Sequence, residues 1–231
     1  MHEKRGHLRV LSANLWGGRA DHQALARQIE ELDVDAIAVQ ELSPGQAAAI
    51  AEVLPHGKLE PATDCGGMGI ALRRPGNVQR LDLCHRDARV VELLPDEWPD
   101  LPDRIELVNV HFQAPHCFPP WRSLARRRAQ LRRLMAYLQG VPKPRRAVVG
   151  DFNATPIWPV YRSLASHLND AAMLHAQLTG SRPARTWGPW HGSPRLLRID
   201  HAFLRGLNVD HFEVVEVTGS DHSGILTDLR I

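Results

Sequence analysis

The sequence contains few cysteines and no long apolar run, and both shortages exclude classes of protein. Its 231 residues include only three cysteines, Cys65, Cys84 and Cys117. An odd number in no metal-ligand spacing argues against a disulfide framework or a zinc site and favours free thiols in a reducing compartment. No apolar stretch reaches the roughly 20 residues of a membrane-spanning helix, and the N-terminal MHEKRGHLRV lacks the apolar core of a secretion signal. We therefore expect a cytoplasmic protein without a transmembrane segment.

Lysine is also scarce, and the charges nearly balance. Lysine occurs only at positions 4, 58 and 143, so almost all positive charge is arginine, and the formal net charge is +2. Arginine suits bidentate phosphate recognition, but a net charge near zero neither favours nor excludes a polyanionic partner. We interpret Arg126, Arg127, Arg132 and Arg133 as the solvated face of an amphipathic helix, with a nucleic-acid footprint as the alternative.

The chain alternates between strand-like and helix-like patterns, which predicts a single α/β domain over residues 1–231. No linker or low-complexity segment divides it, and its length suffices for one large core. Short strands between turns at 68–94 predict an antiparallel meander, and the polar, proline-rich segment 95–103 predicts a surface loop. Further strands are predicted from apolar runs at 8–14, 35–40, 105–112, 147–150, 197–204, 212–217 and 225–229. Mixed strands with interspersed helices indicate a sheet core flanked by helices.

Polar groups suited to phosphate chemistry recur where five of these apolar runs finish. Hydrolysis of a phosphate ester needs a hard cation, a nucleophilic water and a donor for the growing negative charge. Taken alone, the motif GDFN fits equally well a turn in which its aspartate only caps the backbone. The recurrence of polar residues at five strand ends is what favours a shared site. The polar groups in question are Asn14, Glu41, His111, Asp151 with Asn153, and the late set Asp200, Asp221 and His222.

With these blocks the sequence resembles the endonuclease/exonuclease/phosphatase superfamily of metal-dependent phosphoesterases. The resemblance runs from Leu8 to Leu229, and GDFN and SDH are its specific motifs. It implies a four-layer α/β/β/α sandwich of two mixed sheets flanked by helices. It also implies that Glu41 is the principal ligand of Mg²⁺ or Mn²⁺, supported by Asn14, and that Asp221 adds a carboxylate near the metal. Oxygen ligands of this kind are the ones that these cations prefer.

The resemblance further implies a role for each remaining site residue. Asp151 would orient or deprotonate the attacking water, and Asn153 would donate to the phosphate or hold Asp151. His222 would contact the scissile phosphate as a base or as a charge stabiliser. Its predicted partner is Asp200, whose carboxylate would fix the tautomer of the imidazole and favour its protonated form. His111 would donate to the phosphate or to the leaving oxygen.

The sequence also departs from the family patterns. Trp16 stands where apurinic endonucleases carry an aspartate, which argues against a second metal on that side. No glutamate follows Cys65, so His111 needs a partner other than the one that deoxyribonucleases use. The remaining histidines, including His116, His175 and His201, are interpreted as structural or surface residues. The sequence looks most similar to the generic bacterial branch of the superfamily.

We therefore predict a hydrolase, a Mg²⁺- or Mn²⁺-dependent phosphoesterase that cleaves a phosphodiester in nucleic acid or a nucleotide. One alternative is a phospholipid, sphingomyelin-type or small-molecule phosphate ester as substrate. Another is a catalytically inactive binding module, but the presence of all the site residues argues against it. Arg185 and Trp190, in a loop rich in glycine and proline, are predicted to contact the substrate. The sequence shows no inserted hydrophobic hairpin for entering a membrane and no sign of an obligate protein partner.

Overall fold

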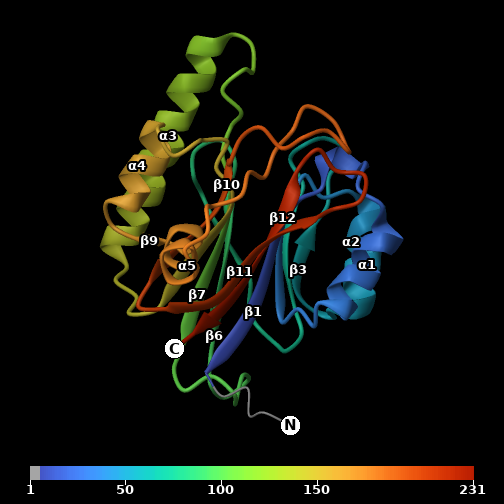
Figure 1. Cartoon of the computed structure of the whole chain (residues 1–231), viewed down its shortest axis with the longest axis vertical. Coiled ribbons are helices and arrows are strands. Elements are labelled where there is room, and N and C mark those ends of the chain that lie inside the picture. The colour runs from blue at the N-terminus through green and yellow to red at the C-terminus, as the bar shows by residue number, and fades with distance from the viewer. Residues whose placement is uncertain (1–5) are drawn as a thin grey trace.

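The computed structural model describes residues 6–231, in which two six-stranded sheets face each other between layers of helices (Figure 1). The first sheet has the spatial order β11 (Asn208–Glu216), β12 (Ser223–Arg230), β1 (His7–Asn14), β2 (Ala36–Gln40), β4 (Met68–Leu72) and β3 (His56–Glu60). The second has the order β5 (Gln79–Leu81), β6 (Ala88–Leu93), β7 (Ile105–His111), β8 (Arg146–Asp151), β10 (Asp200–Arg205) and β9 (Asn169–Asp170). Both sheets are mixed, because β1 with β2 and β7 with β8 are parallel and the other pairs are antiparallel.

Helices cover the outer face of each sheet, which confirms the predicted four-layer sandwich (Figure 1). The first sheet is covered by α1 (His22–Glu31) and α2 (Pro44–Val53), and the second by α3 (Pro120–Gly140) and α4 (Pro159–Ala165). The short helix α5 (Ala171–Thr179) lies against β10 and β11, and a 3₁₀ turn at Trp16–Gly18 follows β1. No helix of the described chain is both long and apolar enough to cross a bilayer.

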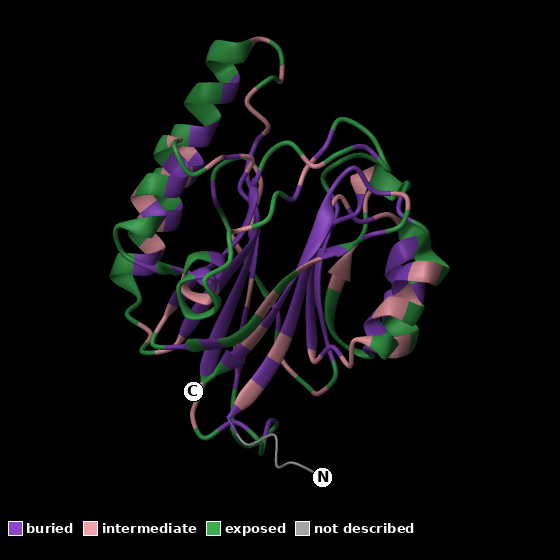
Figure 2. Cartoon of the chain, viewed as in Figure 1, coloured by how far each residue is buried: buried purple, intermediate pink, exposed green. Residues whose placement is uncertain are grey.

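The strands have this arrangement because their apolar residues alternate between two cores. In β1, Val10 packs between the two sheets, whereas Leu11 packs under α1 and α2. In β8, Val149 faces the first sheet and Val148 faces α3 and α4. Successive strand residues point to opposite faces, so a strand covered on both sides reads as a continuous apolar run. Figure 2 shows the result, with central strands buried along most of their length and helices buried on one side only.

Two features of the middle of the chain differ from the sequence-based expectation. The segment 68–94 is not one meander, because β4 pairs with β2 and β3 in the first sheet while β5 and β6 pair in the second. The segment 95–103 is not wholly a surface loop, since Trp98 and Leu101 are buried in the core between the sheets. The indole N–H of Trp98 donates to the carbonyl of Pro75 at 2.9 Å. The sequence pattern did not reveal that these two apolar residues are buried, because the segment around them is polar and rich in proline.

One histidine is a structural part of the second sheet. His201 in β10 is buried, its Nε2 lies 2.7 Å from the carbonyl oxygen of Ala154, and its Nδ1 lies 3.3 Å from a guanidinium nitrogen of Arg198. A guanidinium only donates, so Nδ1 accepts and the neutral ring carries its proton on Nε2. Burial lowers the pKa of His201 to about 4, and the charge of Arg198 contributes in the same direction.

We predict that His201 makes the fold sensitive to acid. The unfolded chain binds a proton near the ordinary histidine pKa of about 6.5, whereas the folded chain resists protonation until the pH approaches about 4. The stability contributed by the neutral ring is therefore complete above the unfolded pKa and is lost as the pH falls toward the folded pKa, by about 3 kcal/mol. In denaturant unfolding across this pH range, the free energy of unfolding of His201→Gln should fall less steeply with decreasing pH than that of the parent protein. His56→Gln, at an exposed position in β3, should keep the parental slope, and an equal slope in all three proteins would contradict the prediction.

Candidate active site

The strand ends that carry the predicted site residues meet at one end of the sandwich, which we call the strand-end face. Parallel pairing brings the ends of β1 and β2 together, and it sets His111 of β7 directly beside Asp151 of β8. The antiparallel β10 begins at this same end, where Asp200 pairs with Asp151. Glu41 directly follows β2, and Asp221 and His222 directly precede β12. Side chains that are far apart in sequence are thus neighbours because of strand direction.

Asp151 lies at the centre of this group and is only 1% exposed. Its Oδ1 accepts the backbone N–H of Asn153 at 2.7 Å, and its Oδ2 accepts the side-chain amides of Asn153 at 2.8 Å and Asn14 at 3.1 Å. Burial raises the pKa of Asp151, and the nearby carboxylates of Asp200 and Glu41 raise it further, against the opposing effect of His222. A carboxylate whose proton affinity is raised in this way is suited to accept a proton from water.

His222 forms the predicted pair with Asp200. Its Nδ1 lies 3.0 and 3.1 Å from the two carboxylate oxygens of Asp200, and its Nε2 lies 4.0 Å from Oδ2 of Asp151. Burial alone would lower the pKa of His222, but the charges of Asp200 and Asp151 outweigh burial and raise it to about 10. His222 is therefore an imidazolium whose second N–H faces Asp151 and the cleft.

His111 has the opposite charge state because it is buried and its partner, Arg86, is a cation. Nη1 of Arg86 lies 2.6 Å from Nδ1 and 3.1 Å from Nε2, so the nearer Nδ1 is the acceptor, and Nε2, which faces two carboxylates, carries the proton of the neutral ring. That Nε2 lies 3.7 Å from Oε1 of Glu41 and 3.6 Å from Oδ2 of Asp151. Burial lowers the pKa of His111 well below its ordinary value, and Arg86 and His222 add to the effect. The site thus holds one charged and one neutral imidazole.

Of the predicted metal ligands, Glu41 and Asp221 line one cleft, and Asn14 is hydrogen-bonded to Asp151, which lines it as well. Oδ1 of Asp221 is buried without a hydrogen-bond partner, while its Oδ2 accepts the indole N–H of Trp187 at 3.1 Å. Oδ1 of Asn14 accepts the backbone N–H of Trp16 and keeps a second lone pair. A buried carboxylate oxygen without a donor is costly unless a cation compensates it, and Mg²⁺ and Mn²⁺ prefer oxygen ligands. The donor set therefore fits a hard divalent cation.

A second grouping at the site also has the geometry of a metal centre. Ligand atoms of Asp151, Asp200 and His222 lie within 4.8 Å of one another. The imidazolium of His222 has no free lone pair, however, and its attraction to two carboxylates already accounts for this cluster. This grouping is therefore no independent evidence for a metal at these three residues.

Backbone strain also concentrates at the site. Among residues 6–231, five non-glycine residues have positive φ, and three of them are Trp16, Glu41 and Asn153. Such conformations cost about 1–3 kcal/mol each and persist only where the surrounding structure enforces them. Asn153 has a left-handed backbone, and its side-chain amide donates to Oδ2 of Asp151.

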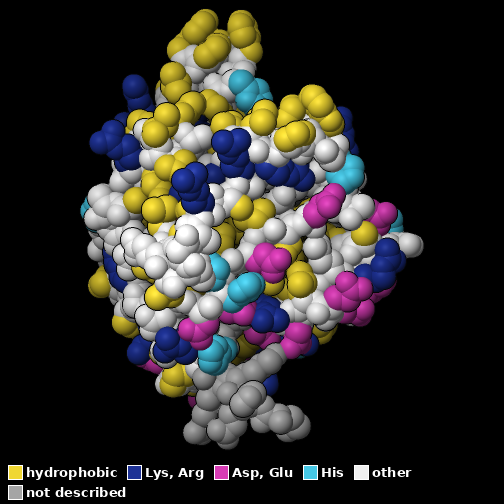
Figure 3. Space-filling view, viewed as in Figure 1, with side chains coloured by type: hydrophobic (Ala, Val, Ile, Leu, Met, Phe, Trp, Pro, Cys, Tyr) yellow, Lys and Arg dark blue, Asp and Glu magenta, His cyan; other side chains and the backbone are white. Residues whose placement is uncertain are grey.

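The strand-end face contains a cleft of about 390 Å³ that opens over these residues. Trp16, Trp158 and Trp187 line it, together with Glu41 and Arg86. Neither Arg185 nor Trp190 is among its lining residues, and both side chains are exposed beside it. Their predicted contact with the substrate therefore stays a prediction. Hydrophobic side chains gather around this end of the molecule, with basic side chains below them (Figure 3).

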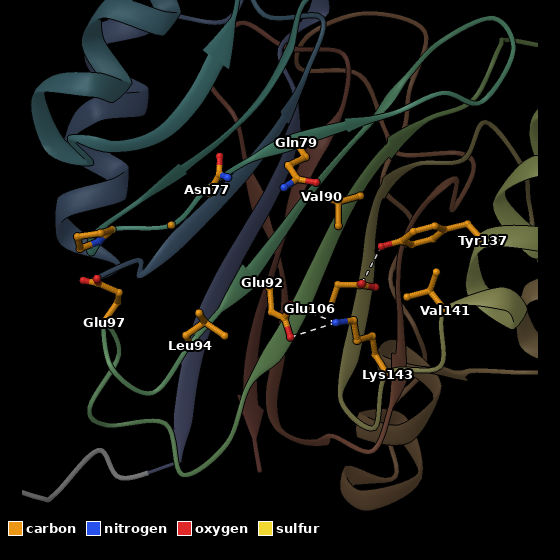
Figure 4. A pocket seen from close by; sticks show the side chains of 12 residues that line it. Asn77, Gln79, Val90, Glu92, Leu94, Glu97, Glu106, Tyr137, Val141 and Lys143 are labelled. Carbon is orange, nitrogen blue, oxygen red and sulfur yellow. Dashed lines mark hydrogen bonds and ion pairs between the residues drawn. The ribbon is translucent and has the colours of Figure 1, made fainter.

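A larger cavity of about 790 Å³ lies elsewhere and does not compete with the cleft as a catalytic site (Figure 4). Its wall contains Glu106, at the opposite end of β7 from His111. Glu106 accepts the hydroxyl of Tyr137 at 2.7 Å, and Glu92 pairs with Lys143 at 3.1 Å. These interactions already satisfy the carboxylates of Glu92 and Glu106 in Figure 4.

Sequence reasoning missed Arg86, because no strand end or motif marks it. The signal lies in the pairing of β6 with β7, where Arg89 is opposite Asn109. Extending this antiparallel register places the residues just before β6 beside His111. Predicting the contact of Arg86 from the sequence would therefore have required knowing that β6 pairs with β7. The expected meander over residues 68–94 did not give that pairing.

Arg127 was wrongly placed on a solvated helix face. It is buried, and its guanidinium donates to the carbonyls of Gln113 and Phe152, so it ties α3 to the segments that follow β7 and β8. Burial lowers the pKa of Arg127 to about 10, and the charge of Asp151 opposes that shift. The other three arginines of the predicted face, Arg126, Arg132 and Arg133, are exposed as expected.

Comparison with solved structures shows the same fold in other proteins. The endonuclease/exonuclease/phosphatase from Bacteroides vulgatus is 15% identical, with a TM-score of 0.75 over 97% of this chain and 99% of that one. TDP2 from D. rerio, complexed with a single-strand DNA product, is 17% identical, with a TM-score of 0.73 over 97% and 99%. A mannosyl-6-phosphatase from Bacteroides thetaiotaomicron is 19% identical, with a TM-score of 0.72 over 97% and 100%. At these identities the likeness shows the fold alone.

The sequence itself places the chain in a family. No curated protein matches it. The family model described as Endonuclease/Exonuclease/phosphatase family matches residues 11–222, a span that contains every predicted metal-binding and catalytic residue. This protein belongs to the endonuclease/exonuclease/phosphatase family.

Proposed function

We propose that this chain is a divalent-metal-dependent phosphoesterase that hydrolyses a phosphodiester, and that residues 1–231 act as one domain. The observation that supports it most strongly is the position of Asp151. This buried carboxylate of raised pKa lies between a charged and a neutral imidazole, and the carboxylate of Glu41 lies within 3.7 Å of the neutral one. A base, two N–H donors and an anionic metal ligand together meet the needs of phosphate ester hydrolysis.

In this proposal Glu41 would hold the cation, with Asn14 and Asp221 as further oxygen ligands. The unpartnered Oδ1 of Asp221 supports this assignment. A bound Mg²⁺ or Mn²⁺ would polarise the phosphate oxygens and compensate the negative charge of the surrounding carboxylates.

Asp151 acts on the attacking water. The backbone and side-chain amides of Asn153 fix its two oxygens, so the carboxylate accepts a proton in a defined direction. Because burial raises its pKa, Asp151 is a stronger base than an ordinary aspartate while remaining within the range of a general base. Asn14 holds Oδ2 from the first sheet and so couples the two sheets at the point of reaction.

The two histidines act on the phosphate. The imidazolium of His222 carries the positive charge that the phosphorane-like transition state needs, and Asp200 keeps its Nε2–H directed toward Asp151 and the cleft. The neutral His111 donates from Nε2 to a phosphate oxygen or to the leaving oxygen, because Arg86 occupies Nδ1. These contacts involve the phosphate and its ester oxygens, which nucleic acids, nucleotides and phospholipids share. Selection among these substrates therefore depends on the surface around the cleft.

Glu41→Gln tests the metal assignment. The change keeps the shape of the side chain and removes its negative charge, so hydrolysis of bis-p-nitrophenyl phosphate with Mg²⁺ or Mn²⁺ should fall on the order of 100-fold or more. Circular dichroism should show an unchanged fold. Glu52→Gln, at an exposed position in α2, should keep full activity. If the Glu41 variant remained fully active in EDTA, Glu41 would not be a metal ligand.

Asp200 and His222 are predicted to act as one unit. Because the carboxylate sets the charge and direction of the imidazole, either single alanine variant should lose on the order of 100-fold in kcat/KM. The double variant should lose little more, since the remaining residue has no partner to act through. A double-mutant cycle with steady-state kinetics measures this coupling. Strictly additive losses would show that the contact has no role in catalysis.

A further inference from the structure

The small net charge conceals a strong division of charge along the chain. Residues 112–199 contain 14 lysines and arginines but only two carboxylates, a net charge of +12, whereas the remaining residues contain 14 and 24, a net charge of −10. The two carboxylates are Asp151 of the active site and Asp170, which is buried and ion-paired with Arg198 at 2.6 Å. The exposed surface of this segment therefore carries no carboxylate at all.

The same segment also exposes large apolar side chains beside the cleft. Phe118 lies just before α3, and Trp121 lies in its first turn. Their side chains are 90% and 69% exposed and contact each other edge to face. Leu124 lies one turn further and is also exposed. The beginning of α3 projects beyond the sheets in Figure 1, and Figure 3 shows hydrophobic side chains at this projection. Cys117, the neighbour of Phe118, lines the cleft, so this projection forms one lip of it.

Other exposed apolar residues lie in or next to the cleft-lining segments. Ile157 is 80% exposed and precedes the cleft-lining Trp158, Leu197 lines the cleft and is itself exposed, and Trp190 is 60% exposed. We call the six residues Phe118, Trp121, Leu124, Ile157, Trp190 and Leu197 the apolar rim. Isolated exposed apolar residues are ordinary, but an apolar group concentrated around a reactive cleft indicates an interaction surface.

Basic side chains accompany the apolar rim. Arg122 and Arg126 are exposed in the first two turns of α3, and Arg185 is exposed directly before the loop that carries Trp190. Aromatic and aliphatic side chains that project from a basic surface have the composition of a helix or loop that lies in the interface of an anionic membrane. Single-stranded nucleic acid would also meet arginine and aromatic rings, but Leu124, Ile157 and Leu197 offer no flat face on which a base can stack. A symmetric dimer through this face would bring two positive surfaces together.

We propose that the apolar rim docks on the surface of an anionic lipid bilayer, and that the phosphodiester that enters the cleft belongs to a lipid headgroup. The inference rests on the proposed phosphoesterase function and names its substrate class. Hydrolysis breaks one P–O ester bond of the headgroup, a water molecule supplies the replacing oxygen, and the leaving alcohol oxygen takes up a proton. Arg185 and Trp190, predicted from the sequence to meet the substrate, belong to the surface that faces the bilayer.

Vesicle flotation tests the docking independently of catalysis. The protein should float with vesicles of phosphatidylcholine and phosphatidylglycerol, more weakly with phosphatidylcholine alone, and less at high salt. The double variant Phe118→Ser/Trp121→Ser should bind on the order of tenfold more weakly, since two interfacial anchors are lost. The double variant Met173→Ser/Leu178→Ser removes two exposed apolar side chains of α5, outside the apolar rim, and should bind like the parent protein. Equal binding by both variants, or no binding by the parent protein, would overturn the proposal.

Hydrolysis separates the docking proposal from the proposed function. The Phe118/Trp121 variant should lose on the order of tenfold more activity on phosphatidylglycerol in vesicles than on soluble bis-p-nitrophenyl phosphate. A parent protein that binds vesicles but hydrolyses neither substrate would contradict the phosphoesterase function and leave the docking intact. Cleavage of single-stranded DNA that depends on Phe118 and Trp121, without vesicle binding, would assign the apolar rim to nucleic acid. A dimer that the same variant dissociates would assign it to a second copy of the chain.

Discussion

The burial of one carboxylate, Asp151, is the constraint on which the site depends. A charged aspartate that is 1% exposed is stable only if donors surround it, and here they come from both sheets. Asn14 reaches it from β1, Asn153 from the turn after β8, and the two imidazoles flank it from β7 and from the turn before β12. The two sheets therefore meet in polar contacts at this end, and a hydrogen bond of 2.6 Å between the side chains of Gln40 and Asn109 also joins them, while apolar residues fill most of the remaining space between them.

The fold could be predicted from the sequence where it depends on local patterns of residues. Apolar runs identified the central strands, Asp21 and Ser43 marked the starts of α1 and α2, and GDFN and SDH located the turns that carry Asp151 and His222. The recurrence of polar strand ends and the family resemblance led us to expect one shared site, but local patterns did not show which strand ends lie side by side. Partner choice between distant strands was not predictable, because β4 and β5 are adjacent in sequence but belong to different sheets.

The positions of Arg86 and Arg127 depend on which strands pair with each other. Arg86 contacts His111 only because β6 pairs with β7, and Arg127 is buried only because α3 lies across the ends of β7 and β8. The charge division of the chain was present in the sequence, but the total net charge concealed it. The exposure of Phe118 and Trp121 could not be read from the sequence, because an aromatic pair near a helix start is equally suited to the core.

In this account the two active-site imidazoles have opposite charge states, because the charges of Asp200 and Asp151 outweigh burial at His222, whereas burial and the charge of Arg86 both keep His111 neutral. Long-range proton–nitrogen correlation NMR of the metal-free protein near neutral pH measures those states directly, because ring nitrogen shifts distinguish an imidazolium from each neutral tautomer. The account predicts an imidazolium at His222 and a neutral ring protonated on Nε2 at His111. Two imidazoles in the same charge state, or a His111 ring protonated on Nδ1, would contradict it.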